Sequence, residues 1–232
     1  LPLLLVFYSW FMEHRPRLHD SKEWNLQDTL IQNSDLLMAA VFLVLSLLPF
    51  YLMFDRRKAQ ARDLVPIALM AAMCVVGRTA FSIVPLPNFK PVTAIVMITG
   101  IAFGPEAGYL TGALAALLSN FLFGQGPWTP WQMYAWGLVG YGAGLLAHSR
   151  LFERTAGVCA YGFAACLGYG FILNLWSILG FFHPQTASEA LAVYAAALPF
   201  DIAHGIATVA FLLILYAPWR RKIARVKVKY GL

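Results

Sequence analysis

The chain has 232 residues, of which 60% are hydrophobic and only 12% are charged, and its formal net charge at pH 7 is +6. Soluble domains carry roughly 25% charged residues because their surfaces must be hydrated, so this composition excludes an ordinary water-exposed globule. The basic residues stand in short clusters between apolar runs, which is typical of membrane topology and not of a surface that follows nucleic-acid phosphates. The chain is therefore predicted to be an integral membrane protein.

Residues 1–62 are predicted to form an N-terminal transmembrane extension. Leu1–Phe11 is an apolar stub without an initiating Met, so we interpret it as the second half of a truncated helix and expect the sequence to be a fragment. Leu36–Phe54 is an apolar run of the length that a spanning helix needs. An outer loop joins the two, and a basic cytoplasmic linker follows.

Residues 63–218 are predicted to form a six-helix core. The second of its apolar runs is short, about 18 Å as a helix, so we expect it either to begin near Phe89 or to span only part of the membrane. Residues 219–232 follow as a basic cytoplasmic tail. The fold class is thus an all-α integral membrane protein, a six-helix transmembrane bundle with an N-terminal extension of one full and one truncated helix. The six core runs are Leu64–Val84, Val92–Phe103, Ala107–Phe123, Trp131–Ala147, Ala156–Phe182 and Val193–Ala217.

The distribution of Lys and Arg predicts the side of the membrane that each loop faces. Basic clusters precede the six-helix core, follow its fourth helix and follow its sixth helix, and together they hold most of the 17 Lys and Arg residues. An even number of crossings separates these clusters, so we place all of them, and the C-terminus, in the cytoplasm. Loops 85–91, 124–130 and 183–192 then face outward from a multi-pass protein of the plasma membrane.

Five polar side chains lie within the predicted helices, all toward the outer side of the membrane. Polar groups in a bilayer are costly and usually face a bundle interior or a cavity, so this asymmetry predicts a polar pocket that opens outward. The structural alternative is an ion pair between Arg78 and Asp201, with the amides satisfying each other. The sequence leaves this choice open. The five residues are Arg78, Asn120, Asn174, Asp201 and His204.

The segment Gly124–Met133, GQGPWTPWQM, has an unusual composition for a membrane loop. Its prolines fix backbone angles, its glycines allow close backbone approach, and Trp128, Trp131 and Gln132 combine flat or apolar surfaces with polar ends. With Gln125, these side chains are candidates for a lid that stacks on and hydrogen-bonds to a planar ligand. An interfacial aromatic belt is the alternative interpretation.

Small residues recur at four-residue spacing on several predicted helices. Such faces let helix backbones approach closely, and we expect the glycine sets to serve packing within the chain. Taken by itself, the alanine pair would also be interpreted as a face for packing within the chain. The sets are Gly100, Gly104, Gly108 and Gly112, then Gly140 and Gly144, and the pair Ala68 and Ala72.

No catalytic motif is apparent. The histidines are scattered without H-E-x-x-H spacing, and neither a G-x-S-x-G elbow nor a Walker A motif occurs. The cysteines, Cys74, Cys159 and Cys166, lie in apolar stretches, where we interpret them as small core or lipid-facing residues. We therefore predict no catalytic residue, no metal site and no cofactor, and we do not expect an enzyme.

The six helices from Leu64 to Ala217, the alanine pair, the glycine signature and the tryptophan-containing loop together resemble an S component, the substrate-binding membrane subunit of energy-coupling factor (ECF) vitamin transporters. The resemblance implies capture of a vitamin or related micronutrient outside the cell. It also implies docking through Ala68 and Ala72 on a T component, which two cytoplasmic ATPase subunits drive.

The branch with this tryptophan-containing loop is similar to cobalamin-type S components. A smaller vitamin or a nucleobase-like precursor fits the same residues. The rival interpretations are a stand-alone secondary transporter, which would need symmetry-related repeats and broken helices at the midplane, and a membrane enzyme.

Overall fold

The computed structural model describes Val44 and residues 61–231. The chain divides into two compact units, Leu1–Ser34 and Asp35–Leu232, and all described residues belong to the second. The predicted helix at Leu1–Phe11 lies outside the described residues, and so does that at Leu36–Phe54 except for Val44, which is helical.

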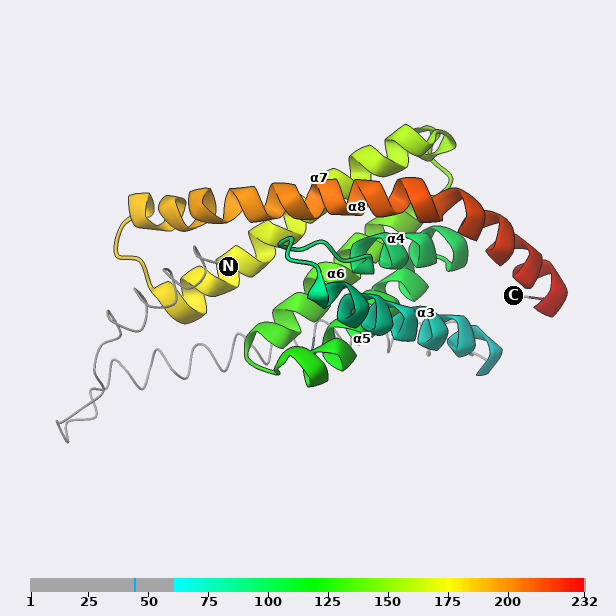
Figure 1. The fold of residues 1–232 in the computed structure, drawn as a ribbon, viewed down its shortest axis with the longest axis horizontal. Helices are drawn as coiled ribbons and strands as arrows, with labels where there is room; N and C mark the ends of the chain where they lie inside the picture. Colours follow the sequence, from blue (N-terminus) through cyan, green and yellow to red (C-terminus); the bar gives the residue numbers. More distant parts are fainter. Residues whose placement is uncertain (1–43, 45–60, 232) are drawn as a thin grey trace. The chain divides into compact units, whose positions relative to one another are not determined.

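Residues 61–231 form helices joined by short turns, with no strand among them, which confirms the all-α fold class (Figure 1). Two 3₁₀ turns and one π-helical turn, Phe81–Ile83, Arg150–Glu153 and Ile178–Phe182, connect or extend the helices. The helices are α3 (Ala61–Ala80), α4 (Val92–Phe103), α5 (Pro105–Phe123), α6 (Trp128–Leu145), α7 (Thr155–Ser177) and α8 (Ala187–Tyr230).

Three segments in the described part of the chain are long and apolar enough to cross a membrane: Asp63–Ile83, Thr155–Phe182 and Ala187–Tyr230. They also expose large apolar side chains, such as Val76 and Ile214 at 67% each, which suits contact with lipid. A bundle in which all six core helices span the bilayer stays a prediction.

The predicted helix positions are confirmed, but the start of α6 and both ends of α8 differ from the prediction by three residues or more. Helix α6 begins at Trp128, three residues before the predicted start, so the loop before it is shorter than expected. Helix α8 begins at Ala187, where the Thr186 hydroxyl accepts a hydrogen bond from the Glu189 N–H (3.3 Å), and it continues through the predicted tail to Tyr230. Pro218 lies inside α8, where proline bends a helix without necessarily ending it, and Figure 1 shows the last part of α8 turned away from its long axis.

The turn between α4 and α5 depends on one glycine. Gly104 has φ 102° and ψ 166°, a backbone conformation that is essentially restricted to glycine. Pro105 follows as the first residue of α5, where its fixed φ suits a helix start and its missing N–H removes no helix bond. The Gly104–Pro105 pair therefore reverses the chain without a loop.

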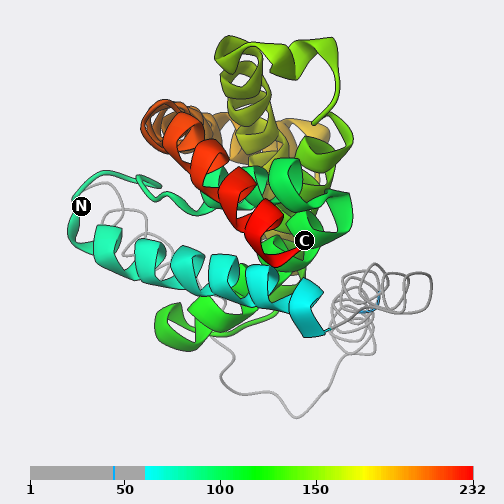
Figure 2. The same ribbon diagram turned by 90° about the vertical axis from the view of Figure 1, so that its right-hand side faces the viewer.

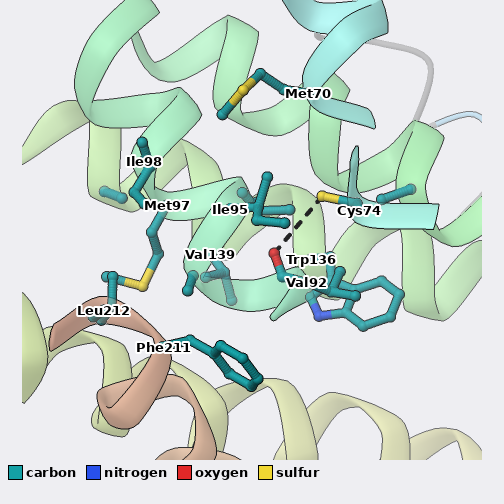
Figure 3. Close-up of a cluster of buried hydrophobic side chains, with 14 of the residues drawn as sticks. Met70, Cys74, Val92, Ile95, Met97, Ile98, Trp136, Val139, Phe211 and Leu212 are labelled. Carbon is teal, nitrogen blue, oxygen red and sulfur yellow. Dashed lines mark hydrogen bonds between the residues drawn. The ribbon is translucent and has the colours of Figure 1, made fainter. Parts of the chain in front are cut away.

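Helix α4 is the central element, and residues 91–100 are all buried. It contacts α3, α5 and α6 on one side and α7 and α8 on the other, as Figures 1 and 2 show. The hydrophobic cluster in Figure 3 combines side chains from α3, α4, α6 and α8, among them Cys74, whose Sγ donates to the Val92 carbonyl (3.8 Å). All three cysteines are free and buried, so the core interpretation of them is confirmed.

The glycine sets pack α4, α5 and α6 backbone to backbone, as predicted. A Cβ atom added to Gly100 would lie 2.1 Å from the Gly140 carbonyl oxygen, and one added to Gly108 would lie 2.5 Å from the same atom. At Gly112 the nearest atom would be the Trp136 carbonyl oxygen at 2.4 Å. No side chain can replace these glycines unless a helix moves.

The end of α8 is tied to the end of α4. The Lys227 ammonium donates to the Ala102 carbonyl (2.7 Å) and lies 5.7 Å from the centre of the Phe103 ring. A cation at a helix C-terminus satisfies carbonyls that lack an intrahelical partner and favours the helix dipole. This contact adds to the packing of Trp219 and Ile223 on the core, which accompanies the continuation of α8 through the predicted tail.

Candidate functional site

A polar cavity of about 50 Å³ lies where the C-terminal end of α3, the segment before α4 and the first turns of α6 meet the middle of α7 and α8. In the predicted topology this end of the bundle faces outward. The cavity is lined by Arg78, Asn88, Lys90, Val92, Gln132, Trp136, Tyr169 and His204.

Arg78 is held on one side by α5. Its Nη1 donates to the hydroxyl of Ser119 and to the side-chain carbonyl of Asn120 (2.8 Å). Both acceptors are neutral and almost fully buried. The guanidinium is therefore positioned by hydrogen bonds, while its positive charge is not neutralised by them.

Asn120 extends this network from α5 to α6 and α7. Its amide nitrogen donates to Thr129 Oγ1 (3.0 Å) and to Gln132 Oε1 (2.8 Å). The Gln132 amide nitrogen in turn donates to the Tyr169 hydroxyl (2.9 Å). An amide placed in this way has its orientation fixed, which is what a binding site needs for selective recognition.

The floor of the cavity is aromatic. The Trp136 ring lies 5.2 Å from the Tyr169 ring at 32°, and the Tyr169 ring meets His204 edge to face at 5.2 Å. Thr93 joins two of these rings, because its Oγ1 accepts from Trp136 Nε1 (3.1 Å) and lies 2.8 Å from His204 Nε2. The rings are thus fixed in orientation beside the amide network.

Two cations flank the Phe123 ring at this end of the bundle. The Arg78 guanidinium lies 4.6 Å and the Lys90 ammonium 5.3 Å from the ring centre. Lys90 is half-buried in the loop before α4, and its pKa is lowered from the ordinary value by this burial and by the positive charge of Arg78. No carboxylate is among the residues that line the cavity.

The alternative of an Arg78–Asp201 ion pair is wrong. Arg78 hydrogen-bonds to α5, whereas the Asp201 carboxylate accepts from the Asn174 amide (3.2 Å). Asp201 also packs against Gly170 of α7, where an added Cβ would lie 2.2 Å from the carboxyl carbon. The five predicted polar residues therefore divide into Arg78, Asn120 and His204 at the cavity network and a separate Asn174–Asp201 pair between α7 and α8.

The tryptophans of the predicted lid do not line the cavity. Trp131 is only 2% exposed within α6, and Trp128 packs edge to face on Trp176 at 5.8 Å. Gln125 is exposed, and its amide nitrogen donates to the Leu117 carbonyl (2.8 Å). Of the four predicted lid residues, only Gln132 reaches the cavity.

Five lining residues were not among the site residues predicted from the sequence, namely Asn88, Lys90, Val92, Trp136 and Tyr169. A signal for Trp136 was present, because it follows Gln132 by one helical turn and therefore shares its face. Lys90 could have been noticed as the single basic residue of its loop. Tyr169 gave no signal, because tyrosines on apolar helices are common.

Apolar helices around a recess that combines fixed amides, cations and aromatic rings define a membrane protein able to hold a small polar ligand. A family model described as "ECF-type riboflavin transporter, S component" matches residues 58–221, and the chain belongs to this family. The family consists of transport subunits. The resemblance to an S component noted in the sequence is confirmed by this match, whereas the likeness to the cobalamin-type branch stays a prediction.

Among curated proteins, the chain is similar to a UPF0397 protein of Vibrio atlanticus (strain LGP32), with 31% identity over 88 residues. The matched region covers 37% of this chain and 48% of that protein, so the chain spans about half of the length of this relative. No solved structure matches the chain.

Proposed function

We propose that the chain is the substrate-binding subunit of an ECF-type importer and that it holds a flavin-like heteroaromatic vitamin at the cavity lined by Gln132, Trp136 and Tyr169. The single observation that carries this proposal is that the amide network of Asn120 and Gln132 meets the aromatic rings of Trp136 and Tyr169. Fixed amide groups and an aromatic floor meet at one recess within a membrane bundle.

The chemistry of a flavin suits these groups. One edge of its ring system alternates carbonyl acceptors with an N–H donor, and the opposite edge is apolar. Gln132 and Asn88 can each donate and accept hydrogen bonds, while Trp136 and Tyr169 offer ring surfaces for stacking. This combination favours a planar ligand with a polar edge over a sugar or an amino acid.

The cavity must open to admit a whole vitamin. Its volume of about 50 Å³ is several times smaller than the roughly 300–1,000 Å³ of a typical small-molecule site. The segment that carries Asn88 and Lys90 contacts α8 through the bond from Asn88 Nδ2 to the Phe200 carbonyl (3.3 Å) and through the Phe89 ring, which lies 5.0 Å from the Phe211 ring. We infer that this segment moves away from α8 on binding, as substrate-gating loops do.

Riboflavin is the substrate that the family description names, and we take it as the first candidate. Cobalamin, which the tryptophan-containing loop favours at the level of sequence, stays a prediction and provides a second ligand for the test. A cobalamin is several times larger than a flavin and would require a correspondingly larger opening.

The direct test is to identify small molecules that co-purify with the protein by mass spectrometry and then to titrate the purified chain with riboflavin and cobalamin. Gln132→Leu should weaken binding by about 10-fold or more, because it removes an oriented amide from the cavity. Gln185→Leu is the matched control, since Gln185 is exposed and lies outside the cavity lining. Equal losses in both variants, or no binding of either vitamin, would contradict the proposal.

Docking on a T component is the second part of the proposed function. Ile67, Met70 and Ala71 of α3 are buried, whereas Ala68 and Ala72 are exposed on the opposite face, where a partner helix could approach closely. Ala68→Trp should abolish uptake in cells that supply the T component and the two ATPases while leaving ligand binding by the isolated chain unchanged.

Ala164→Trp, at an exposed alanine of α7, is the control and should retain uptake. If Ala68→Trp transports normally, the alanine face is not the docking surface. Uptake by the purified chain without the ATPase subunits would instead favour the secondary transporter.

A further inference from the structure

The cavity carries two positive charges that no carboxylate offsets. Arg78 and Lys90 both line it, and the remaining lining residues are neutral or aromatic apart from His204. Within residues 61–231, Asp201 is the single acidic residue on a helix segment next to the cavity, and its carboxylate bonds to Asn174 and packs on Gly170. The site therefore has an excess of positive charge.

This excess is costly for the protein alone. Charged groups inside a membrane protein ordinarily pair with one another, because isolated charges lose hydration. The Phe123 ring attracts both cations, but a cation–π contact does not cancel their charge or their mutual repulsion. Burial and the charge of Arg78 lower the pKa of Lys90, which is the effect expected of a cation without a counter-ion.

The donors that remain available suit an anion. Both hydrogen bonds of Arg78 leave from Nη1, so the rest of its planar donor fork is not used by Ser119 or Asn120. Lys90 contributes a compact ammonium near the same ring.

Resting on the proposed function, the geometry points to a phosphate monoester on the ligand, bound between Arg78 and Lys90 while the heteroaromatic ring lies against Trp136 and Tyr169. A phosphate monoester carries about −1.5 to −2 charges at pH 7, which matches the two cations, whereas a carboxylate would neutralise only one. The protein would then prefer a phosphorylated vitamin to its neutral parent.

The test compares riboflavin with riboflavin 5′-phosphate, using quenching of flavin fluorescence by the purified full chain. We expect the phosphate ester to bind about tenfold or more tightly than riboflavin at low salt, and this preference to shrink as ionic strength rises. Lys90→Gln should lower the ratio of the two affinities toward one, because it removes one of the two cations. Lys229→Gln, an exposed lysine at the end of α8, should keep the full preference.

The outcomes separate this inference from the proposed function. Equal affinity for the two flavins, or tighter binding of riboflavin, overturns the phosphate assignment and leaves the vitamin-binding function intact. A preference that persists in Lys90→Gln also overturns it. If neither flavin binds, both the flavin function and the phosphate assignment fail.

Discussion

The three-helix glycine contact and the polar cavity are built on opposite principles. Where α4, α5 and α6 meet, Gly100, Gly108 and Gly140 bring backbones so close that an added Cβ would overlap a carbonyl oxygen. At the cavity, long side chains from five structural segments reach across space to one another, from Arg78 on α3 to His204 on α8.

The glycine contact is therefore the rigid part of the bundle, and the cavity is the part that can adjust. Backbone contacts through glycine have no alternative arrangement, so they fix how the helices cross. The cavity network depends on rotatable side chains and a loop, so it can rearrange around a ligand. Substrate binding at one end is then compatible with a bundle that moves as one body.

The largest effect is expected at the glycine contact. Gly140→Leu would place a side chain against the Gly108 carbonyl oxygen, only 2.3 Å from the Cβ position, and should prevent the chain from folding. Size-exclusion chromatography of the detergent-extracted protein should show loss of the monodisperse species. Gly168→Ala, at an exposed position where an added Cβ meets nothing within 4 Å, is the control and should fold normally.

Asn120→Leu should have the second-largest effect. The variant removes the buried amide that accepts from Arg78 and donates to Gln132, and it leaves these two groups only their bonds to Ser119 and Tyr169, so we expect the free energy of unfolding to fall by about 2–3 kcal/mol. Thermal unfolding in detergent measures this, and ligand binding should weaken in parallel because both groups line the cavity. Unchanged stability would show that the network does not organise this end of the bundle.

Thr93→Val should have a smaller effect. The change preserves shape and removes the hydroxyl that holds Trp136 and His204, at an expected cost of about 1–2 kcal/mol. Thr111→Val is a matched control, because the buried Thr111 hydroxyl has no hydrogen-bond partner in the described part of the chain. The control should be neutral or stabilising, and equal losses in both variants would contradict the role given to Thr93.

Lys227→Met should have the smallest effect, a loss of about 1 kcal/mol or less, because it removes a single contact at the end of α4. Hydrogen exchange should show earlier opening of the last turns of α8, while ligand affinity stays the same. Lys229→Met is the control, since Lys229 is exposed and its ammonium lies over the ring of the neighbouring Tyr230. No change in exchange would mean that the contact does not hold α8.

The sequence allowed the helices and their glycine contacts to be predicted because both follow from local patterns. Apolar runs set the helices, and four-residue glycine spacing marks a close-packed face. The partner of Arg78 could not be predicted in this way, since hydropathy does not tell whether α5 or α8 lies beside the end of α3. The same limit applies to Trp131, whose burial depends on the rotation of α6, and to α8, where packing of Trp219 and Ile223 on the core outweighs Pro218.

The most direct test of the central claim is a structure of the full chain with riboflavin or its phosphate ester bound. The account predicts a ring stacked near Trp136 and Tyr169, an amide contact from Gln132, and the Asn88–Lys90 segment displaced from Phe200. A ligand found instead beside the Asn174–Asp201 pair, or on the outer face of Trp128, with this cavity unchanged, would contradict it.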